Sequence, residues 1–112
     1  MGAELCEVVI TAPDAAWLAG FTRRLVEQHL AACGHAIAPI RSIYWWDGEI
    51  QDDAEARVAL HTRLEHVPEI VERVNAEHSY DVPCVIALPI GDGNPAYLKW
   101  VEDETQRTGQ LR

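Results

Sequence analysis

Three side chains that can bind a transition metal lie close together in the sequence, at His78, Asp81 and Cys84. Imidazole and thiolate groups suit copper and zinc, and a carboxylate adds a harder ligand. The spacing is not that of a closed zinc signature, and one chain supplies at most three ligands here, so a subunit boundary would have to supply more. We predict a divalent-metal site at these residues. The alternative is that His78 only caps the last carbonyl groups of the helix before it.

A second group of candidate residues combines one basic and three aromatic side chains, Arg41, Tyr44, Trp45 and Trp46. The aromatic residues would line either a ligand pocket or an interface between subunits, and packing between subunits is favoured. Arg41 would either hold an anion in a cleft between subunits or pair with an acidic residue such as Asp52, and pairing is favoured. We therefore predict a trimer interface or ligand cleft at these four residues.

The other cysteine and histidine residues point less clearly to a ligand. Cys33 precedes Gly34, and a free cysteine in such a place is usually packed, as we also expect for Cys6. His35 is expected to be solvated or to lie at an interface. The 3 cysteines are an odd number at wide spacing, which favours reduced thiols in a cytosol over a disulfide framework.

Catalytic patterns are missing from the sequence. A nucleophile elbow with its histidine and acid is not found. The segment Gly91-Asp92-Gly93 lacks the lysine that follows a phosphate-binding loop. We predict that the protein is not an enzyme and has no obligatory cofactor.

Length and charge narrow the possible partners. The 112 residues, 48% of them hydrophobic, suit a single domain over residues 1–112. A net charge of −9 disfavours phosphate backbones and anionic membrane surfaces, and it attracts cations. No apolar run reaches the roughly 18 residues of a membrane helix, and acids stand where an export signal carries basic residues. We expect a cytoplasmic protein without nucleic-acid or membrane partners.

The elements that must position these residues can be read from hydrophobic periodicity and turn signals. Asp14 is a good N-cap, Asp47-Gly48 is a hairpin turn signal, and Asn94-Pro95 starts a helix. The predicted strands cover residues 5–12, 36–46, 49–61 and 84–90, and the predicted helices cover 14–32, a segment from about 67 onward, and one from 95.

This order predicts an α+β fold of ferredoxin-like type, strand–helix–strand–strand–helix–strand, with an added C-terminal helix. The hairpin of residues 36–61 is long, because strands usually run about 5–6 residues. A chain of 112 residues cannot cover its aromatic tip. We therefore predict that other subunits cover it.

Six motifs in order resemble the CutA family of divalent-cation tolerance proteins, from about Val8 to Trp100. They are Thr11-Ala12-Pro13-Asp14, Leu30-Ala31-Ala32-Cys33, Arg41-Ser42-Ile43-Tyr44-Trp45-Trp46-Asp47-Gly48, His78-Ser79-Tyr80-Asp81-Val82-Pro83, Ile86-Ala87-Leu88-Pro89, and Gly93-Asn94-Pro95 with Tyr97-Leu98 and Trp100.

The resemblance implies a homotrimer of ferredoxin-like subunits with interlocked hairpins, similar in assembly to the PII signalling proteins. It implies a role in the response to metal ions and binding of Cu(II) or another divalent cation. A PII-like trimer that binds a small molecule, or a trimeric scaffold for a protein partner, is the alternative. The sequence departs from the family where a Lys-Thr pair is common, since His61-Thr62 stands there.

Overall fold

A computed structural model of the chain describes residues 2–107. Its strands and helices follow the predicted order, with a single 3-10 turn added before the second helix. The elements are β1 (Leu5–Ala12), α1 (Ala15–Glu27), β2 (Cys33–Trp46), β3 (Glu49–Arg63), the 3-10 turn η1 (Leu64–His66), α2 (Val67–Glu77), β4 (Val85–Pro89) and α3 (Pro95–Glu104).

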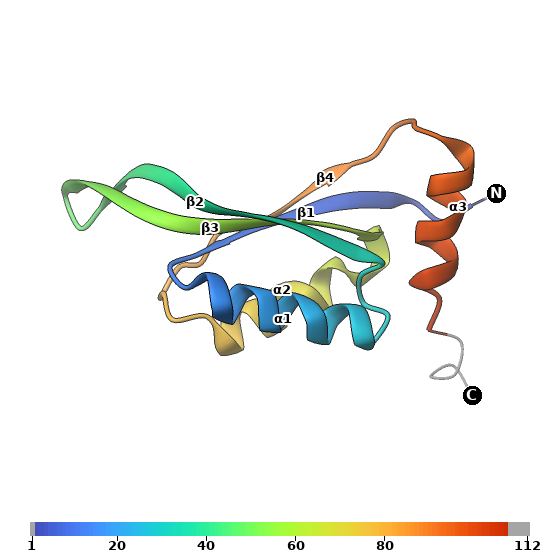
Figure 1. Cartoon of the computed structure of the whole chain (residues 1–112), viewed down its shortest axis with the longest axis horizontal. Coiled ribbons are helices and arrows are strands. Elements are labelled where there is room, and N and C mark those ends of the chain that lie inside the picture. Colours follow the sequence, from blue (N-terminus) through green and yellow to red (C-terminus); the bar gives the residue numbers. More distant parts are fainter. Residues whose placement is uncertain (1, 108–112) are drawn as a thin grey trace.

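The four strands form one antiparallel sheet in the order β2-β3-β1-β4. Helices α1 and α2 cover one face of this sheet, and α3 stands at the end of the sheet opposite the hairpin tip (Figure 1). This arrangement confirms the predicted ferredoxin-like α+β fold. None of the helices among the described residues is long and apolar enough to cross a membrane.

The core lies between the sheet and the two covering helices. Alternate residues of β1 and β3, such as Val8, Ile10 and Leu60, point toward α1 and α2 and are fully buried. Gly34 of β2 also faces this layer, where a Cβ atom would lie 2.5 Å from Thr22 Cγ2 and 3.0 Å from Leu60 Cδ2. The neighbours of Gly34 in the strand therefore face the other side of the sheet.

The first helix ends earlier than the sequence pattern predicts, at Glu27 rather than at residue 32. His29 takes a left-handed conformation with φ of 60°, and the amide of Leu30 donates to the carbonyl of Leu25 at 2.9 Å. This turn stops the helix and packs Leu30 and Ala31 into the core. As a consequence β2 begins at Cys33, not at residue 36.

The β2–β3 hairpin extends beyond the two covering helices (Figure 1). It gives the molecule extents of 47 × 30 × 23 Å and a radius of gyration of 14.9 Å, against about 13 Å for a compact chain of this size. Near its tip Trp45 is 71% exposed, Ile43 63% and Ile50 61%. The predicted uncovered aromatic arm is therefore present in the structure.

Helix α3 begins at the predicted cap, where the side chain of Asn94 accepts a hydrogen bond from the amide of Ala96 at 3.1 Å. Its C-terminal end is held by two imidazoles. His29 Nδ1 donates to the carbonyl of Glu104 at 2.8 Å, and His66 Nε2 donates to the carbonyl of Thr105 at 2.7 Å. Buried Val101 packs with Leu5 and Ala32. These contacts fix α3 at this end of the sheet.

Candidate metal centre

One group of three metal-type side chains comes together within residues 2–107, formed by Cys33, His35 and His61. One ligand atom from each residue lies within 4.8 Å of the other two. Cys33 and His61 are half-buried, and His35 is exposed. The group is therefore partly buried, and its exposed side is accessible to an ion from solvent.

Strand pairing brings these residues together. Cys33 lies directly opposite His61 in the β2–β3 ladder, and His35 pairs with Ala59, two residues before His61. Residues at i and i+2 share a face of a strand, so Cys33 and His35 lie on the same face as His61, the face turned away from α1 and α2, with Cys33 directly opposite His61 and His35 diagonal to it. The site thus depends on rigid backbone pairing between two strands.

Glu7 supports His61 from the neighbouring strand. It pairs with His61 in the β1–β3 ladder and accepts a hydrogen bond from His61 Nε2 at 3.0 Å. With the proton on Nε2, Nδ1 carries the lone pair of the ring, and Cys33 Sγ lies 3.8 Å from Nδ1. A carboxylate that holds the far nitrogen of a histidine is the usual second partner of a metal-binding imidazole.

The hydroxyl of Tyr97 in α3 also contacts Cys33 and His61. Its hydroxyl oxygen lies 2.5 Å from His61 Nδ1 and 3.2 Å from Cys33 Sγ. Burial, the hydrogen bond with Cys33 and the nearby Cys33 and Glu7 groups raise the pKa of Tyr97 to about 12. The phenol is therefore protonated near neutral pH and donates to His61.

The spacing of His61 Nδ1 and Cys33 Sγ fits two ligands of a tetrahedral ion. Bond lengths of about 2.0–2.1 Å to nitrogen and about 2.3 Å to sulfur place two ligands of such an ion about 3.6 Å apart. His61 Nδ1 and Cys33 Sγ are 3.8 Å apart, so little movement is needed. One thiolate and two imidazoles favour copper or zinc over magnesium, calcium or manganese, which prefer oxygen ligands.

The sequence-predicted ligands His78, Asp81 and Cys84 do not form such a group among the described residues. His78 is 8% exposed and uses both ring nitrogens, because Nε2 donates to the carbonyl of Thr11 at 2.8 Å and Nδ1 accepts from the amide of Tyr80 at 3.0 Å. Asp81 and Cys84 are exposed. His78 therefore joins its loop to the end of β1.

Replacing His78 with alanine is expected to lower the free energy of unfolding by about 1–3 kcal/mol, because a part-buried carbonyl and a part-buried backbone amide lose their partners. The edge contact with Trp17, at 5.3 Å between ring centroids, is lost as well. Urea denaturation of the two proteins measures the difference. Equal midpoints and slopes would show that these hydrogen bonds contribute nothing to stability.

The predicted interface or cleft residues lie along the hairpin. Arg41 forms a two-point ion pair with Asp52, at 2.8 and 2.7 Å, so the favoured pairing is confirmed. The hydrogen bond from Arg41 lowers the pKa of Asp52. The hydroxyl of Tyr44 donates to Asp53 at 2.8 Å, whereas Trp45 and Trp46 are exposed near the tip. Arg41 is thus already neutralised.

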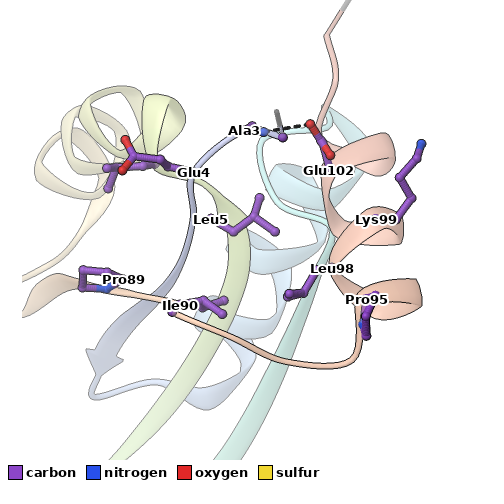
Figure 2. Close-up of a pocket in the computed structure, with 12 residues that line it drawn as sticks. Ala3, Glu4, Leu5, Pro89, Ile90, Pro95, Leu98, Lys99 and Glu102 are labelled. Carbon is purple, nitrogen blue, oxygen red and sulfur yellow. Dashed lines mark hydrogen bonds between the residues drawn. The ribbon is translucent and has the colours of Figure 1, made fainter.

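A cavity of about 490 Å³ lies away from this chemistry, between β1, the end of β4 and α3 (Figure 2). Its walls are largely apolar, with Leu5, Ile90 and Leu98 among them. Glu102 at its rim accepts a hydrogen bond from the amide of Ala3 at 2.8 Å, and Lys99 extends from the outer side of α3 to pair with Asp103. The cavity holds no side chain of the metal group.

Sequence reasoning missed the group because it placed Cys33 at the end of a helix and His35 in a connecting segment. The available signal was the alternation Cys33-Gly34-His35, which puts two ligand types on one face of a strand. The second signal was His61 on the partner strand, where lysine is common. From the sequence, Cys33 is expected to be packed and His35 to be solvated or at an interface. Neither expectation includes the proximity of these two residues to His61.

The fold and this group together define a class: a small ferredoxin-like α+β protein with a thiol–imidazole group on the sheet face turned away from α1 and α2. The model of the CutA1 divalent ion tolerance protein family matches residues 6–104. The chain belongs to this family. The resemblance drawn from the six motifs is thereby confirmed, and the family is one of divalent-cation tolerance and not a known enzyme family.

Relatives from plants and bacteria agree with this assignment. The chain is 39% identical over 101 residues to the chloroplastic protein CutA 1 of Oryza sativa, covering 90% of this chain and 57% of that relative. It is 40% identical over 98 residues to the divalent-cation tolerance protein CutA of Thermus thermophilus, covering 88% and 95%. The chain thus spans little more than half of the plant relative and nearly all of the bacterial one.

Solved structures show the same fold. CutA1 from Oryza sativa superposes with a TM-score of 0.89 at 37% identity, covering 94% of this chain and 96% of that one. The Thermus thermophilus protein gives 0.87 at 38% identity, with 91% and 99% covered. The protein from Archaeoglobus fulgidus, described as periplasmic, gives 0.87 at 35% identity, with 91% and 99% covered.

Proposed function

We propose that this chain is a non-catalytic divalent-cation tolerance protein that binds Cu(II) or a related thiophilic ion through Cys33, His35 and His61. The observation that carries this proposal is the group of three ligand atoms within 4.8 Å, with Glu7 bonded to the far nitrogen of His61. The family's divalent-cation tolerance supports it. The set His78, Asp81 and Cys84 is the competing arrangement for the same ion.

We further propose that the protein works as a PII-like homotrimer in the cytoplasm, each subunit forming one domain over residues 1–112. The support is the hairpin, whose exposed apolar residues Ile43, Trp45 and Ile50 lie beyond the cover of their own helices. Exposed apolar surface of this kind marks an interface. Arg41 and Tyr44 are bonded to acids of the same arm, so they support an interface more than an anion cleft.

Two cysteine variants separate the competing metal sites. Cys33→Ala removes the thiolate of the group described above, and Cys84→Ala removes an exposed thiol that belongs only to the competing set. Calorimetric titration with Cu(II), Zn(II) and Mg(II), in a non-coordinating reductant for Zn(II), is expected to show binding of the first two ions only. We expect Cys33→Ala to lose most of this binding and Cys84→Ala to keep it.

A spectroscopic arm identifies the ligand directly. Co(II) in place of Zn(II) gives a thiolate charge-transfer band when a cysteine is bound. The band is expected in the wild type and in Cys84→Ala and is expected to be missing in Cys33→Ala. Loss in Cys84→Ala alone would favour the His78 set, and equal binding of all three proteins would remove both cysteines from the function.

A further inference from the structure

We propose that the Tyr97 hydroxyl closes the Cys33–His35–His61 group when no metal is bound, and that an arriving ion must displace it. The inference rests on the proposed metal binding and adds its regulation. Tyr97 is thus assigned as a positioning residue that competes with the ion, not as a ligand. Through Tyr97, the position of α3 becomes sensitive to metal.

The competition follows from the single lone pair of His61 Nδ1. Glu7 accepts a hydrogen bond from His61 Nε2, which keeps the ring proton on Nε2, so Nδ1 is the acceptor for the Tyr97 hydroxyl, at 2.5 Å. A metal ion needs the same lone pair, and it cannot be shared with a hydrogen bond of that length. Metal binding therefore requires the Tyr97 hydroxyl to leave Nδ1.

The hydroxyl oxygen of Tyr97 also forms a hydrogen bond with the thiol of Cys33. Tyr97 Oη and Cys33 Sγ are 3.2 Å apart, so one hydroxyl satisfies two of the three ligand atoms. Half-buried polar atoms cost free energy when they lack a partner. The hydroxyl thus stabilises the metal-free state specifically, and this stabilisation opposes the metal.

Displacement of the Tyr97 hydroxyl can change the structure of α3 at a distance from the metal site. Tyr97 lies in its first turn, whereas His29 and His66 hold the carbonyls at its other end. The ring of Trp100 lies 5.7 Å from that of Tyr97 and is partly exposed. A shift of Tyr97 therefore changes the surroundings of Trp100 while the C-terminal end of α3 stays fixed.

The test is the affinity of Tyr97→Phe for Zn(II), measured in competition with a chromophoric chelator. Removing the competing hydroxyl is expected to tighten binding roughly tenfold, because up to two hydrogen bonds of the metal-free state are lost. Tyr80→Phe, which removes a phenol bonded to Glu55 at 2.9 Å, is the matched control and is expected to leave affinity unchanged. A purely structural role for Tyr97 would not tighten binding. Tyr97→Leu supplies a second hydroxyl-free variant if Tyr97→Phe does not fold.

Fluorescence provides an independent readout. Zn(II) does not quench tryptophan by redox or paramagnetic routes, so a change on its addition reports a change of environment. The change is expected in the wild type, to disappear in Trp100→Phe and to be small in Tyr97→Phe.

The outcomes separate the two proposals. If Cys33→Ala binds Zn(II) as the wild type does, the metal site itself is wrong. If Cys33→Ala loses binding while Tyr97→Phe binds more weakly than wild type, Tyr97 is a ligand and the competition is overturned. Unchanged affinity in Tyr97→Phe overturns it too.

Discussion

Replacing His61 with alanine is expected to weaken Zn(II) and Cu(II) binding by more than about 100-fold. Loss of a second partner such as Glu7 alone typically costs about 10–100-fold, and loss of a ligand costs more. His61 is the central member of the group. It lies opposite Cys33 in the ladder, donates a hydrogen bond to Glu7 and accepts one from Tyr97. Its removal leaves Cys33 and His35 of β2 without the ligand that β3 supplies.

Glu7→Gln is the graded companion to this variant. It keeps the size of the side chain and a hydrogen-bond acceptor but removes the negative charge that faces His61 Nε2. We expect an intermediate loss of affinity, within about 10–100-fold. His78→Ala is the matched histidine control, and we expect its affinity to equal that of the wild type.

Chelator competition at fixed pH measures all of these affinities. Wild-type affinity in His61→Ala would refute the proposed site. Loss in His78→Ala with retention in His61→Ala would instead place the ion in the loop that follows α2.

Trp46→Asp is expected to convert the proposed trimer to a monomer or an unfolded chain. Trp46 lies at the end of β2, beside Trp45, on the arm that its own helices do not cover. If other subunits cover this arm, the aspartate is buried without a partner, and burying an unpaired charge costs several kcal/mol. Because assembly and folding are coupled, stability should also become dependent on protein concentration.

Light scattering measures this result directly, since the wild type should have three times the 12.5 kDa mass of one chain. Trp46→Phe keeps an aromatic ring and is expected to remain a trimer. A wild type that is folded and monomeric at micromolar concentration would remove the trimer from the proposal. A Trp46→Asp protein that stays trimeric would show that Trp46 is not in the interface.

The fold could be predicted from local signals because these signals and the tertiary structure agree. Asp14 accepts from the amides of Ala16 and Trp17 as an N-cap should, and Asn94 does the same for α3. The hairpin turn at Asp47-Gly48 has positive φ at both residues, as the dipeptide suggested. Each of these features is decided within a few residues of sequence.

The metal group could not be predicted in the same way because it depends on contacts across the sheet. The periodic pattern of α1 continues through Leu30 and Ala31, which are buried as a helix would bury them, although they lie in a turn. Nothing in the local pattern marks His29 as a left-handed residue. A helix predicted to run to residue 32 leaves Cys33 and His35 outside the strand, so their proximity to His61 is not predicted.

The left-handed turn at His29 sets the phase of the strand that follows it. Side chains alternate between the two faces along a strand. The residue at which the strand begins therefore decides that Gly34 packs against Thr22 while its two neighbours face away from the helices. A deletion of a single residue in this turn would exchange the faces, forcing a thiol and an imidazole into the helical layer and leaving a bare glycine outside. The chemistry of the open face is therefore encoded in the length of a short connection that itself carries no ligand.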